Sequence, residues 1–130
     1  MKINAILFAG LFTLITGHLW AGAVQPYIPV DIDEDNMAAT GYMAATRYSK
    51  NDVEYIGCGV TVRDNGFTTG SCSARDPDGN VAYCDIIDNE PLAKAVLGIS
   101  DYSFISFGWN ELDECTYIRV SHRSFYLPKK

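Results

Sequence analysis

The chain has 130 residues, with 16 acidic and 10 basic side chains, a formal net charge of −6 at pH 7 and 12% aromatic residues. This length suits one domain with one hydrophobic core, and the acidic balance disfavours general charge attraction to nucleic acid or anionic membranes. The four cysteines show no CxxC or CxxCH spacing, so neither a zinc site nor a haem attachment is predicted. We expect no cofactor and no bound metal.

Residues 1–23 have the features of a secretory signal peptide. Lys2 precedes an apolar run over 3–15, and the segment ends in the small residues AGA, which form an A-x-A cleavage site. The apolar run is shorter than the roughly 20 residues that span a bilayer, so we expect cleavage after Ala23 and no stable membrane insertion. Loss of Lys2 brings the net charge to −7. The expected destination is the bacterial periplasm or the extracellular medium.

The region after the signal peptide divides into an acidic arm and one domain. Residues 24–36 carry two prolines and no apolar periodicity, so we expect an extended N-terminal arm there, followed by a single domain over 37–130. The domain begins with a near-repeat, MAATGY followed by MAATRY. A six-residue step keeps one face of a strand, so the repeat predicts a strand over 39–48 with Tyr42 and Tyr48 on the same face.

Residues 53–87 predict three antiparallel strands joined by two turns. The sequences DNG and DPDG supply the turn residues. With three-residue loops at 64–66 and 77–79, the apolar even-numbered positions of all three strands share one face. Cys58, Cys72 and Cys84 then form one row across that face.

This row of cysteines predicts a disulfide pairing, provided that neither hairpin contains a bulge. The residues that flank the two loops are hydrogen-bonded pairs, and strict alternation makes Cys58–Cys72 a non-hydrogen-bonded pair and Cys72–Cys84 a hydrogen-bonded one. A non-hydrogen-bonded pair brings the Cα atoms to about 4.5 Å, within reach of a disulfide. We therefore expect Cys58–Cys72, which leaves Cys84 for Cys115.

The rest of the chain predicts one short helix and one hairpin. Asp88 or Asn89 can cap the helix and Gly98 marks its end. Its expected apolar stripe consists of Leu92, Ala93, Val96, Leu97 and Ile99. The fold class is therefore α+β: a mostly antiparallel, disulfide-stapled sheet of about six strands, arranged as a meander, a short helix that packs on the sheet, and a C-terminal hairpin.

Two registers are open for the hairpin over 103–121. One places Phe107 opposite Tyr117 and Trp109 opposite Cys115, which suits a disulfide. The other places Ile105 opposite Ile118, which suits the aliphatic pattern but turns Cys115 to the far face. The sequence does not decide between them.

The sequence predicts no catalytic residue. His122 is the one histidine after the signal peptide, and on a strand its neighbour Ser121 points to the opposite face. The alternative is a small hydrolase that acts on glycans through paired carboxylates, which need only the right separation in space. The acids available for such a pair include Glu54, Glu111, Asp113 and Glu114.

Aromatic side chains predict a binding function instead. Tyr55 and Tyr83 occupy odd positions, which point away from the core if the even positions face it, and Trp109 lies at the mouth of the last hairpin. Tyrosine and tryptophan are enriched at binding surfaces because they combine a large area with a polar group. We therefore expect a non-enzymatic binding module whose partner is another exported protein or a glycan, and not nucleic acid.

Three stretches, VEYIGCGV, SFISFGWNELDECTYI and SFYLP, resemble segments of small exported bacterial proteins that carry no assigned function. This resemblance implies one exported domain over most of the chain after the signal peptide, and it implies no activity or site. The Tyr-x-x-Cys spacing of YIGC is also similar to that of periplasmic lysozyme inhibitors, which are small disulfide-bonded β proteins. No inhibitory-loop motif accompanies that spacing.

Overall fold

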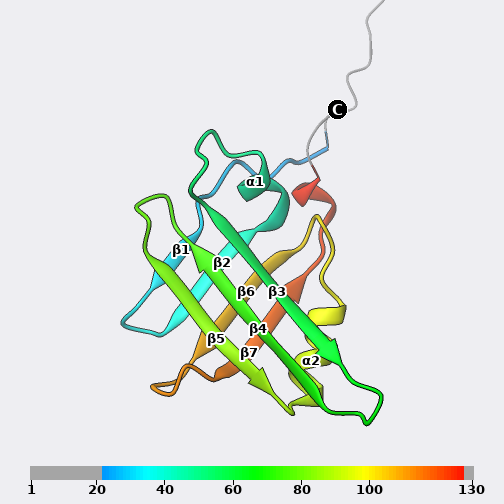
Figure 1. The fold of residues 1–130 in the computed structure, drawn as a ribbon. Helices are drawn as coiled ribbons and strands as arrows, with labels where there is room; N and C mark the ends of the chain where they lie inside the picture. The colour runs from blue at the N-terminus through cyan, green and yellow to red at the C-terminus, as the bar shows by residue number, and fades with distance from the viewer. Residues whose placement is uncertain (1–21, 128–130) are drawn as a thin grey trace, which may run out of the picture.

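A computed structural model describes residues 22–127, so residues 1–21 of the expected signal peptide lie outside the described part. The strands form two antiparallel sheets, one with the order β1-β2-β6-β7 and one with the order β3-β4-β5. Figure 1 shows the three-stranded sheet in front of the four-stranded sheet, with the strands of the two sheets crossing. The elements are β1 (Asp31–Asp33), β2 (Ala38–Tyr42), α1 (Met43–Arg47), β3 (Tyr55–Val62), β4 (Thr68–Arg75), β5 (Val81–Ile87), α2 (Glu90–Leu97), β6 (Phe104–Trp109), β7 (Cys115–Ser121) and the 3-10 turn η1 (Ser124–Tyr126).

The expectation of one sheet with about six strands is wrong in its arrangement, although the mostly antiparallel character is confirmed. The apolar face of the front sheet is covered by the back sheet, and not by a helix alone. β6 supplies Ile105 and Phe107, which are fully buried between the two sheets. The rest of the core comes from both sheets and from α2, and it includes Val30, Ala39, Ile56, Ala74, Ile86 and Val96.

The segment expected to form an arm belongs to the back sheet. β1 pairs with β2 in antiparallel fashion, with Ile32 opposite Ala39. Val30, just before β1, is buried in the core. The segment is extended, as its composition predicts, but its apolar residues fasten it to the domain.

The two copies of the near-repeat adopt different structures. Residues 37–42 run through β2, whereas residues 43–47 form α1, so the strand expected over 39–48 is wrong in its second half. β2 pairs with β6 only as far as Tyr42 opposite Phe104, where β6 begins. Beyond that point no strand is available for pairing, and the alanine-rich sequence follows its helical preference.

The front sheet has the registers that the turn sequences predict. Val62 lies opposite Thr68 across the first turn, and Cys72 lies opposite both Cys58 and Cys84. Cys58 is bonded to Cys72 within this sheet, and Cys84 is bonded to Cys115 of β7. The second disulfide therefore joins the front sheet to the back sheet.

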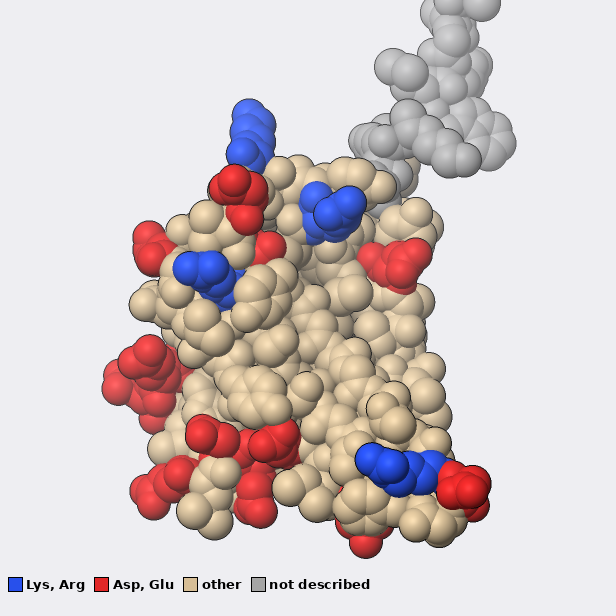
Figure 2. All heavy atoms as spheres, in the orientation of Figure 1, with Lys and Arg blue, Asp and Glu red and all other residues tan. Residues whose placement is uncertain are grey.

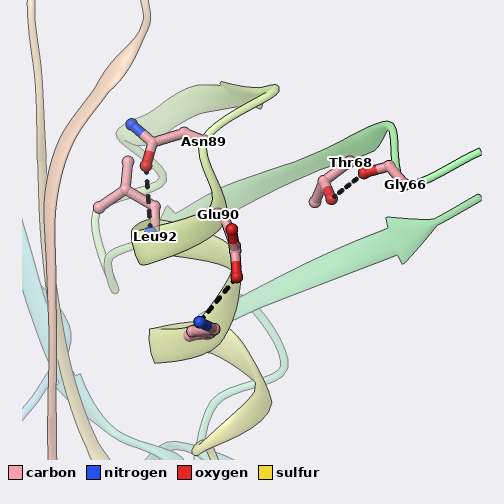
Figure 3. A network of polar contacts seen from close by, with 6 residues as sticks. Gly66, Thr68, Asn89, Glu90 and Leu92 are labelled. Carbon is pink, nitrogen blue, oxygen red and sulfur yellow. Dashed lines mark hydrogen bonds and ion pairs between the residues drawn. The ribbon is translucent and has the colours of Figure 1, made fainter.

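α2 begins where the capping residues predict. Asn89 Oδ1 accepts a hydrogen bond of 3.2 Å from the Leu92 N–H, and Lys94 pairs with Glu90 at 2.7 Å on the exposed side (Figure 3). Ala93 and Val96 are buried, but Leu97 is exposed, so it does not belong to the apolar stripe. No helix in residues 22–127 is long and apolar enough to cross a membrane.

A bulge decides the register of the last hairpin. Trp109 lies opposite Cys115, as in the first of the two expected registers, but Gly108 lies opposite Tyr117. This irregularity shifts the rest of the hairpin by one residue, so that Phe107 faces Ile118. Both Cys115 and Ile118 therefore contact the core, which neither regular register allows.

Candidate functional site

The three aromatic residues singled out from the sequence do not form one patch. Tyr55 on β3 and Tyr83 on β5 are 43% and 46% exposed on the outer face of the front sheet. They flank the central strand β4, whose Ser73 lies opposite Tyr83 and Gly57. Trp109 belongs to the back sheet and packs against the core, with its ring centroid 6.1 Å from that of Phe107.

A larger feature lies at the end of the molecule where the two ends of the described chain meet. A groove with a volume of about 800 Å³ lies between the segment before β1, helix α1 and the C-terminal turn η1. Figure 1 shows α1 and η1 next to each other at the top of the molecule. Four tyrosines line this tyrosine groove: Tyr27, Tyr42, Tyr48 and Tyr126.

Each wall of the tyrosine groove is held by a defined contact. Tyr42, at the end of β2, makes an edge-on contact with Tyr126, with ring centroids 4.9 Å apart, and packs against Phe104 at the same distance. The Gln25 N–H donates to the Phe125 carbonyl at 2.7 Å, which ties the two ends of the described chain together. Tyr48 follows α1 and is 71% exposed, so its ring is free to contact a ligand.

The lining of the tyrosine groove is mostly apolar, with a few polar side chains among the rings and aliphatic groups. Apart from the tyrosines, it contains the polar side chains of Gln25, Ser49, Lys50 and Asn51. Burial raises the pKa of the Tyr42 hydroxyl, and the nearby Tyr126 raises it further. The groove therefore presents aromatic rings together with neutral polar groups and one cation.

Glu54 lies beside the tyrosine groove and fastens the N-terminal segment to the domain. Its carboxylate accepts hydrogen bonds from the Tyr27 hydroxyl, from Asn51 Nδ2 at 2.5 Å and from the Val30 N–H at 2.7 Å. Burial raises the pKa of Glu54, but these hydrogen bonds, first that of Tyr27, outweigh burial and lower the pKa below its ordinary value. A carboxyl group that stays ionised in this way is poorly suited to act as a general acid.

Replacement of Glu54 tests this role. We expect Glu54→Gln to lower the free energy of unfolding by about 1 to 3 kcal/mol at neutral pH, because a charged acceptor of several hydrogen bonds is lost. The pKa of Glu54 is lower in the folded protein than in the unfolded chain, where it is about 4.3. The contribution of Glu54 to the free energy of unfolding is therefore complete above about pH 4.3 and is lost as the pH falls through the folded-state pKa. Urea unfolding at about pH 7 and about pH 3 measures both effects.

Asp52→Asn is the matched control for that experiment. Asp52 is exposed two residues away, and its carboxylate accepts no hydrogen bond within the described residues. The Asp52→Asn substitution removes the same charge, and we expect it to change the free energy of unfolding by less than about 0.5 kcal/mol. An equal loss in both variants, or a loss in Glu54→Gln that persists at acid pH, would contradict the role of Glu54.

The other candidate carboxylates lie far from Glu54. Glu111, Asp113 and Glu114 belong to the connection between β6 and β7, at the lower left of Figure 1, whereas Glu54 precedes β3 at the top. Acidic side chains gather at the lower left of the surface in Figure 2. Asn110 organises this connection, because its Oδ1 accepts from the Leu112 and Glu114 N–H groups at 2.9 and 3.0 Å. The fold therefore keeps Glu54 apart from the other three acids, which share one connection.

His122 meets serines other than its sequence neighbours. Its Nδ1 lies 3.2 Å from Ser103 Oγ and 3.5 Å from Ser100 Oγ. Ser103 is fully buried and its Oγ accepts from the Ser100 N–H at 2.8 Å. A substrate carbonyl cannot reach this oxygen, so the Ser103–His122 contact holds the loop before β6 and does not form a nucleophilic site.

The one group of side chains in residues 22–127 whose spacing could hold a metal ion consists of Cys72, Cys84 and Cys115. Both disulfides pass through this group, so none of these sulfurs is a free thiolate. Metal ligation by cysteine requires the thiolate. The group is therefore part of the core and not a metal site.

Comparisons with known proteins add no function. No protein-family model, no curated protein and no solved structure matches the chain. The candidate site therefore depends on geometry alone. Sequence reasoning missed the tyrosine groove because its walls come from segments far apart in the chain. The sequence feature that comes closest to indicating the groove is the near-repeat, which places Tyr42 and Tyr48 six residues apart on either side of α1.

Proposed function

We propose that this protein is an exported, disulfide-stabilised, non-enzymatic binding module, and that its ligand occupies the tyrosine groove. The observation that carries the proposal is the groove itself, whose volume of about 800 Å³ lies within the usual range for ligand sites. The expected ligand is a segment of another exported protein or a glycan.

The chemistry of the lining supports a binding role. Tyrosine rings offer large, rigid contact areas at low entropic cost, and their hydroxyl groups supply orientation. Asn51 and Gln25 add amide groups that can donate and accept, and Lys50 adds a positive charge. Such a set suits the apolar face and hydroxyls of a sugar ring, or the side chains of an extended peptide.

The geometry gives less support to a glycan hydrolase. Such an enzyme needs two carboxyl groups about 5 to 9.5 Å apart across the scissile bond. Among the residues that line the tyrosine groove there is no aspartate or glutamate, and Glu54 beside it is held as a hydrogen-bond acceptor. We therefore propose no hydrolytic mechanism.

Two tyrosine variants test which surface binds. We expect Tyr48→Ala to reduce capture of the partner about five- to thirtyfold when the tagged protein is crosslinked in its own compartment and recovered, because a tyrosine that a ligand covers contributes about 1 to 2 kcal/mol. Mass spectrometry identifies a protein or a glycan adduct. Tyr48 is 71% exposed, so its removal leaves the core unchanged.

Tyr83→Ala is the matched control, because Tyr83 is also exposed but lies on the outer face of the front sheet. We expect this variant to capture the same partner as the parent. Loss of capture in Tyr83→Ala with retention in Tyr48→Ala would move the site to the front sheet. Unchanged capture in both variants would contradict binding through either surface.

A further inference from the structure

The four edge strands of the two sheets differ in how well they are protected from pairing with another chain. β1 has three residues, and two of them are Asp31 and Asp33. β5 carries Asp85, whose N–H donates to the Asp113 carbonyl at 2.7 Å, and β7 carries a bulge and Arg119. Short length, charge, bulges and coverage are the devices by which natural sheets avoid edge pairing.

β3 is neither short, charged nor bulged, and α1 and α2 pack beside it without pairing with its backbone. It has eight residues, YIGCGVTV, with no charged side chain and no proline, and it pairs only with β4. Figure 1 shows β3 at the right edge of the front sheet, and Figure 2 shows neither blue nor red along it. An uncharged edge of this length, with backbone groups that pair with no other strand, is a template for strand addition.

The hydrogen-bond pattern identifies the groups that point outward. The Arg63 N–H donates to the Phe67 carbonyl at 2.9 Å, so residues 63 and 67 are a hydrogen-bonded pair. Strict alternation along the registered strands then directs the backbone groups of the odd-numbered residues of β3 toward β4. The N–H and C=O groups of the even-numbered residues point to the free edge: Ile56, Cys58, Val60 and Val62.

We propose that the free edge of β3 pairs with the same edge of a second copy of this chain, in antiparallel register about a two-fold axis at Gly59. This inference is independent of the tyrosine groove. In a symmetric antiparallel pairing, residues whose backbone N–H and C=O groups point to the free edge must lie opposite one another in the two copies. Only a register centred on Gly59 achieves this for the whole set, with Ile56 opposite Val62 and Cys58 opposite Val60 of the other copy.

Side chains are complementary in this register. Val62 is 58% exposed although it is apolar, and this register places it against the strand of the second copy, opposite Ile56, whose own side chain is buried in its core. On the outer face, Tyr55 lies opposite Arg63 of the other copy, which permits a cation–π contact. The region between them is uncharged, so two acidic chains can approach there. Because an edge contact is small, the dimer is expected to form in a concentration-dependent way.

Glycine substitutions test the position of the two-fold axis. A Cβ atom built on Gly59 or on Gly57 meets nothing within 4 Å, so either residue can be replaced without a clash in the single chain. Gly59→Lys places two like charges directly opposite each other, and we expect it to weaken dimerisation about tenfold. Gly57→Lys adds the same charge opposite Thr61 of the other copy and is expected to change dimerisation less than about threefold.

Sedimentation of the oxidised protein over a range of concentrations measures these effects. The wild type is expected to shift from monomer to dimer as its concentration rises. An equimolar mixture of Gly59→Lys and Gly59→Glu chains is expected to form a heterodimer that is tighter than either homodimer. A wild type that stays monomeric at its highest soluble concentration, equal effects of Gly59→Lys and Gly57→Lys, or no heterodimer in the mixture would overturn the proposal.

Discussion

We expect the double variant Cys84→Ala with Cys115→Ala to unfold about 15 to 25 °C below the oxidised parent protein, measured by circular dichroism. This disulfide closes a separation of 31 residues, for which the chain-entropy model gives a loss of about 3 to 4 kcal/mol. It is also the covalent link between the front and back sheets. Its removal leaves the two sheets joined only by packing, by hydrogen bonds and by the connecting chain.

The double variant Cys58→Ala with Cys72→Ala is the matched comparison. Its disulfide spans 14 residues within a hairpin whose strands are already paired by backbone hydrogen bonds. We expect a loss of about 3 kcal/mol at most, and a smaller fall in the melting temperature. A larger loss in this variant than in the Cys84/Cys115 variant would show that the link between the sheets is not the more important one.

The second large effect is expected for Phe107→Ala, which should lower the free energy of unfolding by about 3 to 5 kcal/mol in a denaturant titration. Phe107 is fully buried at the centre of β6 and faces the front sheet. Its removal leaves a cavity between two sheets that are each held by their own hydrogen bonds, so the site can collapse only in part.

Phe67→Ala removes the same side chain from a partly exposed position before β4. We expect it to cost less than about 1 kcal/mol. Equal losses in the two variants would mean that the core does not lie between the sheets as described. A loss of less than about 1 kcal/mol in Phe107→Ala would contradict the same point.

The front sheet could be predicted because its information is local. The turn sequences at 64–66 and 76–79 set the loop lengths, and the alternation of apolar residues then sets the registers of β3, β4 and β5. The same count gives the bond between Cys58 and Cys72 in one step. Likewise, the cap at Asn89 fixes the start of α2.

The division into two sheets could not be predicted in the same way. β2 pairs with β6, more than sixty residues further along the chain, and no turn sequence encodes such a pairing. The near-repeat shows the limit directly, because two almost identical hexapeptides form a strand in one place and a helix in the other. Their structures depend on whether a strand partner is within reach.

The candidate site was not predicted, because none of Tyr55, Tyr83 and Trp109 lines the tyrosine groove. Alternation correctly placed Tyr55 and Tyr83 on the exposed face, but it carried no information about which exposed aromatics gather around a groove. The tyrosine groove depends on the meeting of Gln25 with Phe125, at opposite ends of the described chain. The bulge that lets both Cys115 and Ile118 contact the core is likewise invisible to strict alternation.

Site-specific photo-crosslinking tests the proposed binding function most directly. A photoreactive phenylalanine analogue replaces Tyr48 in one variant and Tyr83 in another, and both proteins are irradiated in their own compartment after export. We predict a discrete adduct of one partner from position 48, in the tyrosine groove, and none from position 83. An adduct from position 83 alone, or no adduct from position 48, would contradict the assignment of the groove as the binding site.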